Sequence, residues 1–206
     1  RIERRAQLAD ARAQQAELDR DVARGHVAEE LRDVERIDLR AAALHALVYR
    51  SYTEEDFAFI EALYRSTRDA ELALSGWPDG EKEAFLTQQH RAQHHHYRAY
   101  YPNAERLILE QDGAPIGRLY VDAWPLEFRI VDISLLPVAR GQGLGEAILR
   151  DMIAWAQDQA KGVSIHVEKF NPARRLYLRL GFVVTEDKGV YELMEFGTPG
   201  AAKALA

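Results

Sequence analysis

Three glycines lie within five positions, at Gly141, Gly143 and Gly145, between an apolar run and a stretch with helical spacing. Glycine has no Cβ, so successive backbone amides at such a turn can approach a ligand closely. The N-terminus of the helix that follows adds a positive dipole, which favours an anion. The segment predicts an anion-binding cradle suited to a pyrophosphate, and a plain strand-to-helix turn is the alternative.

Two familiar phosphate-binding loops do not fit this spacing. A Walker-type loop needs Lys followed by Ser or Thr after its last glycine, whereas Glu146 and Ala147 follow Gly145. A dinucleotide fingerprint needs G-x-G-x-x-G inside a β-α-β unit, whereas here G-x-G-x-G follows a predicted antiparallel meander. A cradle at this position would therefore belong to another class of site.

The run from Pro137 to Gly145 resembles the acetyl-coenzyme A signature of the GCN5-related N-acetyltransferases, in which Arg or Gln is followed by x-x-G-x-G/A. A second block, residues 171–182 (NPARRLYLRLGF), resembles the Asn…Leu-Tyr…Gly-Phe segment of the same family and follows at the expected distance. The resemblance covers residues 44–196. It implies the α/β acyl-CoA N-acyltransferase fold with a mixed sheet, and acetyl-CoA as the cosubstrate.

The resemblance also assigns residues to the cofactor. It implies that the strands containing ISLL and VSIHV separate, and that the pantetheine arm between them pairs with backbone groups near Leu135 and Leu136. A backbone amide there would also donate to the thioester oxyanion. Asn171 would hydrogen-bond the pantetheine, and Arg140 would contact a phosphate. The implied pyrophosphate cradle consists of Arg140, Gly141, Gln142, Gly143, Leu144 and Gly145.

Transfer of an acyl group to an amine requires a neutral nucleophile, a stabilised oxyanion and a proton donor for the departing thiolate. Tyr177 stands where the family carries its general acid. A phenol with a pKa of about 10 is a strong hydrogen-bond donor to a thiolate whose conjugate acid has a pKa of about 8.5. The alternative is a ring that only packs beside Leu176 and Leu180.

The sequence offers several candidates for the general base. His166 and Glu168 share one face of a predicted strand, and His166 stands where some relatives that acetylate protein N-termini carry a catalytic Glu. An imidazole suits proton transfer at neutral pH. Asp132, Glu168 and a chain of waters are the other candidates, and a packed or surface histidine is the alternative for His166.

Three consecutive histidines, His94, His95 and His96, suggest a metal site. Adjacent side chains on a helix diverge by about 100°, so these three cannot chelate one ion together. We interpret them as a polar helix face and expect no metal.

Hydrophobic periodicity and turn residues indicate which elements position these residues. We expect two helices after a first strand, then an antiparallel meander with a hairpin turn at Asp112 and Gly113. A short helix capped by Asn171 and ended by Gly181 precedes a final hairpin. The expected ranges are strand 44–52, helices 54–69 and 81–97, strands 106–111, 116–123 and 128–136, helix 145–160, strand 163–167, helix 172–180, and strands 182–186 and 190–196.

Composition excludes several classes of protein. The chain has 206 residues, enough for one domain, and its 47% apolar and 29% charged residues are typical of a soluble globular protein. No apolar run reaches the roughly 20 residues of a membrane span, so we expect none. The net charge of −6 argues against nucleic acid as a partner. The lack of cysteine excludes thiol chemistry and fits a cytoplasmic protein.

Residues 1–42 are rich in Ala, Arg, Glu, Asp and Gln, which predicts a helical extension outside the resemblance. Residues 43–197 would form the acetyltransferase domain, and residues 198–206 a short tail. We expect direct acetyl transfer from acetyl-CoA to the primary amine of a small molecule, peptide or protein in a ternary complex, with a homodimer as a candidate assembly. The alternative is a catalytically silent module that binds acetyl-CoA and engages a partner through the extension.

Overall fold

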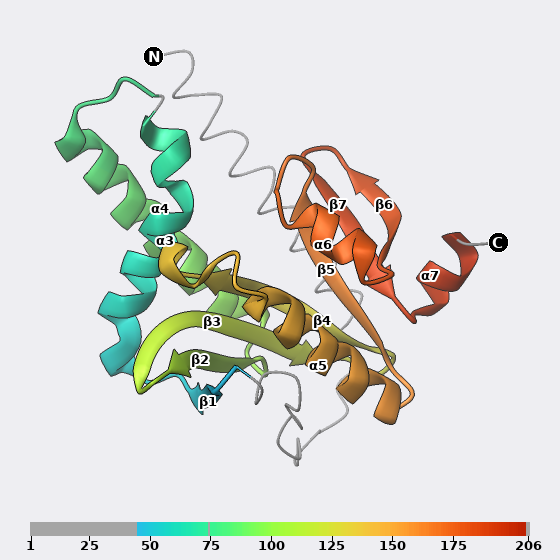
Figure 1. Ribbon diagram of the computed structural model, residues 1–206. Coiled ribbons are helices and arrows are strands. Elements are labelled where there is room, and N and C mark those ends of the chain that lie inside the picture. The colour runs from blue at the N-terminus through green and yellow to red at the C-terminus, as the bar shows by residue number, and fades with distance from the viewer. Residues whose placement is uncertain (1–44, 74, 205–206) are drawn as a thin grey trace.

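The computed structural model describes residues 45–73 and 75–204 (Figure 1). The domain is built on one seven-stranded sheet of order β1-β2-β3-β4-β5-β7-β6. Neighbouring strands are antiparallel except β4 and β5, which run parallel because a helix carries the chain across between them. The strands are β1 (Leu47–Ser51), β2 (Glu105–Gln111), β3 (Ala114–Ala123), β4 (Glu127–Leu135), β5 (Gly162–Glu168), β6 (Val183–Lys188) and β7 (Tyr191–Phe196). The predicted mixed α/β fold is confirmed.

Helices cover both faces of this sheet. α5 and α6 lie on the face turned to the viewer in Figure 1, whereas α3 and α4 pack on each other and α3 contacts β3 and β4. Short 3₁₀ turns, η1 (Glu54–Asp56) and η2 (Pro137–Ala139), precede α3 and α5. The helices are α3 (Phe57–Ala73), α4 (Asp79–Tyr100), α5 (Leu144–Asp158), α6 (Arg174–Arg179) and α7 (Pro199–Ala204).

The main core lies between the sheet and α5. Ile148, Met152 and Trp155 recur at helical spacing along α5, so they form one apolar stripe that faces the strands. Phe128 of β4 stacks on Trp155 with ring centroids 3.7 Å apart. Burying each of these side chains stabilises the fold by about 1.5 to 3 kcal/mol, and the Phe128–Trp155 stack fixes the last turns of α5 against the beginning of β4.

Strands β4 and β5 pair over four residues and then separate. The pairing joins residues 127–130 to residues 162–165 and ends at Ile130 opposite Ile165. A bulge in β4 accompanies the separation, because Tyr120 pairs with Asp132 but the next residue of β3 pairs with Ile130, which leaves Val131 as the extra residue. A bulge bends its strand and increases the local twist. We call the resulting opening the split; the family resemblance implied it.

One expectation about the elements needs correction, and another lies outside the described residues. Within the predicted tail, Pro199–Ala204 form helix α7, and the Thr198 hydroxyl accepts a hydrogen bond from the Ala201 amide at 3.0 Å. His96 is 4% exposed and its ring lies 4.6 Å from that of Tyr100, so a polar helix face is the wrong interpretation for His96. The predicted extension over residues 1–42 lies outside the described part of the chain.

Candidate functional site

The split exposes one side of β4. The Leu136 amide donates to the Ile116 carbonyl of β3 at 2.8 Å, and the Leu136 carbonyl accepts from the Ala139 amide at 2.9 Å. Successive residues of an antiparallel strand alternate in direction, so the backbone groups of Leu135 and Ile133 face away from β3, toward the split. Of the two leucines predicted to bind pantetheine, Leu135 is thus the one turned to the split. Sequence analysis missed Ile133, which shares its direction.

The glycine cluster forms the start of α5. Gly141 and Gly143 have φ angles of 74° and 83°, a region that residues with a Cβ adopt only with strain. A Cβ added at Gly141 would meet no atom within 4 Å, and one at Gly143 would meet only the His45 ring, at 3.7 Å. Backbone conformation, and not lack of space for a side chain, therefore requires these glycines. With the first-turn amides of α5, which have no acceptor within the helix, the geometry is that of an anion cradle.

The polar side chains predicted around the cradle make local contacts. Arg140 is exposed, and its Nε donates to the Leu135 carbonyl at 2.8 Å. Gln142 Nε2 donates to the Val138 carbonyl at 2.6 Å, which ties the loop to the preceding turn. Asn171 lies in the connection between β5 and α6, where its side-chain oxygen accepts from the Ala173 amide at 2.9 Å.

Tyr177 lies on α6 and is 4% exposed. Its ring packs edge-on against Phe182 with centroids 5.6 Å apart, so the packing role considered from the sequence is present. Among the described residues, its hydroxyl makes no hydrogen bond. Burial, and then the negative charge of Asp132, raise the pKa of the Tyr177 phenol well above its ordinary value. Tyr177 is therefore a protonated phenol at neutral pH, and the negative charge of Asp132 on β4 contributes to its raised pKa.

Asp132 follows the bulge directly and is bound at both carboxylate oxygens. Arg118, 2% exposed, contacts it through Nε at 3.0 Å and Nη2 at 2.8 Å. The hydroxyls of Tyr97 and Ser134 donate to it at 3.1 and 2.8 Å. Gln93 of α4 accepts from the same Arg118 Nη2 at 2.8 Å. Asp132 is thus engaged in a buried network toward α4, and Arg118 and Tyr97 are members that sequence analysis did not assign to the site.

His166 comes immediately after the last residue of β5 that pairs with β4. Its Nδ1 lies 3.1 Å from Nη1 of Arg129, a buried arginine of β4. The structure therefore places His166 at the branch point of the split, with the Arg129 cation beside it.

Glu168 ends β5 two residues later, on the same face. Its Oε1 accepts from the Tyr191 hydroxyl at 3.1 Å and lies 3.7 Å from Nη1 of Arg68 on α3. Burial, and then the negative charge of Glu168, raise the pKa of Tyr191. Nearby on α3, the Ser66 carbonyl accepts from Arg140 at 3.4 Å. Helix α3 thus contacts both arms of the split.

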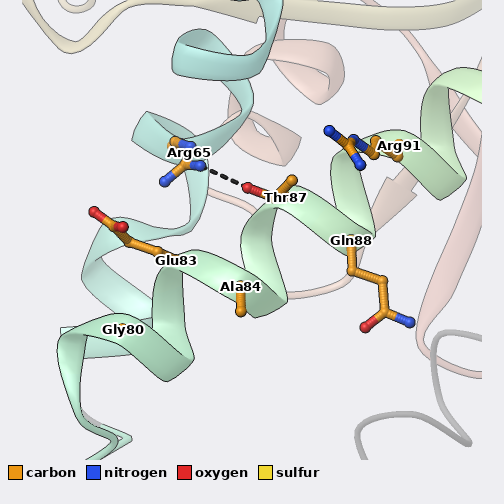
Figure 2. Close-up of a pocket in the computed structure, with 7 residues that line it drawn as sticks. All are labelled: Arg65, Gly80, Glu83, Ala84, Thr87, Gln88 and Arg91. Carbon is orange, nitrogen blue, oxygen red and sulfur yellow. Dashed lines mark hydrogen bonds between the residues drawn. The ribbon is translucent and has the colours of Figure 1, made fainter.

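A separate hollow of about 600 Å³ lies on α3 and α4 (Figure 2). Arg65 Nη2 donates to the Thr87 hydroxyl at 2.7 Å, and that hydroxyl donates to Glu61 at 3.0 Å, so the two helices are tied together at its edge. The hollow contains none of the predicted site residues, so we do not identify it with the reaction site. Its lining residues are Arg65, Gly80, Glu83, Ala84, Thr87, Gln88 and Arg91.

The lengths of the helices and the grouping of side chains bear on membrane spans and metal sites. Within residues 45–73 and 75–204, none of the helices combines the length and apolarity that a membrane span requires. In the same part of the chain, His, Cys, Asp and Glu side chains form no group of three or more that could hold a metal ion.

Comparison with solved structures shows the fold. The PaiA N-acetyltransferase of Thermoplasma acidophilum, solved in complex with coenzyme A, matches with a TM-score of 0.56 and 15% identity, over 73% of this chain and 98% of that one. An acetyltransferase of Thermus thermophilus matches with a TM-score of 0.53 and 19% identity, over 73% of this chain and 95% of that one.

Comparison at the level of sequence shows the family. A curated Bacillus subtilis protein, whose name proposes it as a ribosomal protein bS18-alanine N-acetyltransferase, is 33% identical over 84 residues. That match covers 39% of this chain and 54% of the relative, so the chain spans about half the length of the curated relative. The model of the acetyltransferase (GNAT) family matches residues 60–182, more than half of the chain. The chain therefore belongs to the acetyltransferase (GNAT) family.

Proposed function

We propose that this chain transfers the acetyl group of acetyl-CoA to a primary amine by direct attack within a ternary complex. The observation that carries the proposal is the split between β4 and β5, which opens beside the glycine-rich start of α5. The glycine cradle suits an anion, the free edge of β4 offers backbone amides to an oxyanion, and the Tyr177 phenol is a candidate proton donor. The alternative, a silent module with the same fold, is an outcome of the test below.

The residues present fit an elongated ligand with a pyrophosphate. Acetyl-CoA supplies the activated acyl group when bound. The amides of Gly141 to Gly145 and the α5 dipole would hold the pyrophosphate, and the backbone of Leu135 and Ile133 would hold the pantetheine arm. Asn171, which follows β5, would hydrogen-bond the pantetheine arm from the other side of the split. A phosphate contact from Arg140 requires its exposed side chain to leave the Leu135 carbonyl.

Tyr177 would serve as the proton donor. Its raised pKa keeps the hydroxyl protonated at neutral pH, so it can donate a hydrogen bond to sulfur as the C–S bond breaks. Asp132 contributes through its charge, which opposes ionisation of the phenol. Because Arg118, Tyr97 and Ser134 already occupy its oxygens, we assign Asp132 to positioning and electrostatics and not to proton removal from the amine.

The proton of the attacking amine then needs another acceptor. Glu168 lies at the mouth of the split, and its two contacts, from Tyr191 and Arg68, both involve Oε1. We propose that Glu168, directly or through water, takes the proton that the amine loses.

The acceptor class is tested first with alanine-initiated peptides, since the name of the Bacillus subtilis relative refers to N-acetylation of an alanine of a ribosomal protein. A panel of an alanine-initiated peptide, a lysine peptide with a blocked N-terminus, a polyamine, an amino acid and an aminoglycoside is mixed with acetyl-CoA, and free thiol is measured. Turnover with any amine above the rate without acceptor supports the enzyme. Cofactor binding with no thiol release across the panel contradicts it and favours the silent module.

A further inference from the structure

A chain of buried and partly buried polar side chains joins β4 to β5 next to the branch point. Arg129 is 4% exposed, and its guanidinium lies 4.6 Å from the centre of the Trp124 ring. Its Nη2 donates to Glu127 Oε1 at 3.1 Å, and the same oxygen accepts from the hydroxyl of the fully buried Ser164 at 2.5 Å. Its Nη1 lies 3.1 Å from Nδ1 of His166. This cluster uses none of the residues assigned above to the cofactor.

We propose that Arg129 is a positioning residue that fixes His166 in the neutral tautomer protonated at Nε2, so that His166 is a hydrogen-bond donor and not the general base. A guanidinium can only donate hydrogen bonds, so Nδ1 of His166 must accept. A neutral imidazole with a bare Nδ1 carries its one proton on Nε2. A proton added to Nδ1 would remove this bond and place two cations about 3 Å apart, which costs free energy in a buried site.

Neighbouring groups hold the guanidinium in place. Arg129 pairs with Ser164 across the last stretch of β4–β5 pairing, and His166 lies two residues beyond Ser164 on the same face of β5. Glu127 neutralises the arginine and the Trp124 ring covers it, so the guanidinium is held at its 3.1 Å contact with His166. The fixed ring orientation follows from this packing, and its catalytic meaning rests on the proposed function.

His166 would then differ in its role from the catalytic Glu that some relatives carry at this family position. A carboxylate there can take a proton, whereas an imidazole that already carries its hydrogen on Nε2 cannot take another there. His166 Nε2 is also buried, so His166 would hold the branch point of the split in place, and the amine proton would leave through Glu168 or solvent. His166 neither gains nor loses a proton in this step.

The tautomer is measured by long-range ¹H–¹⁵N correlation spectra of the ¹⁵N-labelled full chain at neutral pH, with His166→Gln to assign the signals. We expect a bare Nδ1 and a protonated Nε2 for His166, with exposed His95 as the averaged reference. Arg129→Met should release the ring to an averaged spectrum, and Arg129→Lys, which keeps a cationic donor, should restore the fixed form. A ring protonated at Nδ1, or at both nitrogens, in the unmodified chain would overturn the proposal.

Turnover provides an independent measurement. His166→Gln keeps an N–H donor but cannot take up a proton, so we expect it to lower turnover by less than tenfold, and His166→Ala to lower it further. A loss of about 100-fold or more in His166→Gln would identify His166 as the base and overturn the proposal. If no acceptor is turned over, the proposed function fails while the spectra still decide the tautomer.

Discussion

Acidification should destabilise this protein through His90 of α4, whose ring packs against α3. Its ring is fully buried, and its centroid is 5.2 Å from that of Phe57 and 5.6 Å from that of Tyr64. Neither ring nitrogen has a hydrogen-bond partner among the described residues. Burial, and then the positive charge of Arg118, lower the pKa of His90 from 6.5 to about 4, although Glu61 opposes the shift.

The sign and size of the effect follow from proton linkage. The unfolded chain binds a proton at this residue near pH 6.5, whereas the folded protein binds it only near pH 4. Above pH 6.5 the residue is neutral in both states and has no effect on stability. Below pH 6.5 the free energy of unfolding falls by about 1.4 kcal/mol per pH unit, and below pH 4 the loss stays at about 3 kcal/mol.

Urea unfolding of the unmodified chain and of His90→Phe, at about pH 7.5 and about pH 5, measures the loss of stability caused by protonation of His90. The free energy of unfolding of the unmodified chain should fall by about 2 kcal/mol more than that of the variant, which keeps a ring but binds no proton. The control is His95→Gln, an exposed histidine of the same helix, and it should follow the unmodified chain. Parallel pH curves for the unmodified chain and His90→Phe would refute the reasoning, because His90 would then bind its proton equally well in both states.

Four further predictions concern the site and the domain boundary. Gly143→Asp adds a carboxylate to the cradle and should lower acetyl-CoA affinity by orders of magnitude in a folded protein; unchanged affinity in calorimetry would remove the cofactor assignment. Tyr177→Phe should lower turnover about 30- to 150-fold with cofactor affinity preserved, and a loss of only a few-fold would contradict its role as acid. Asp132→Asn leaves the buried Arg118 without its anion and should cost about 3 kcal/mol in urea unfolding, so an equally stable variant would argue against the network. Deletion of residues 1–42 should leave a folded domain that binds acetyl-CoA, and failure of the shortened chain to fold would move the boundary.

The order of the elements was predictable because short-range signals mark their ends. Asp112 and Gly113 have φ angles of 53° and 76°, and positive angles at both positions are what a two-residue hairpin turn requires. Gly181, with a φ angle of 93°, follows α6 as predicted. Helix lengths were less predictable, since α4 extends two or three residues beyond its expected range at each end into polar segments without apolar periodicity.

The bulge that accompanies the split has a signal in the sequence, namely a shift in the alternation of core residues along β4. In β4, Phe128 and Ile130 face the core, and after Val131 the core positions become Ile133 and Leu135, so the alternation shifts by one residue. Such a shift is typical of a bulge. The pairings of Arg118 with Asp132 and of Arg129 with His166 had no comparable signal, because they join strands and depend on register.

The same split gives one sheet four edges instead of two. Besides β1 and β6, residues 131–135 of β4 and 166–168 of β5 each turn one side of a strand toward the inside of the domain. Amides on such inner edges lack a partner strand and should exchange hydrogen with solvent faster than those of the complete ladders. A ligand lying along both edges acts as a missing strand and joins two leaves that otherwise share four residue pairs. Because binding to the folded state stabilises it by mass action, the ligand concentration should set the resistance of the domain to proteolysis as well as its rate of turnover.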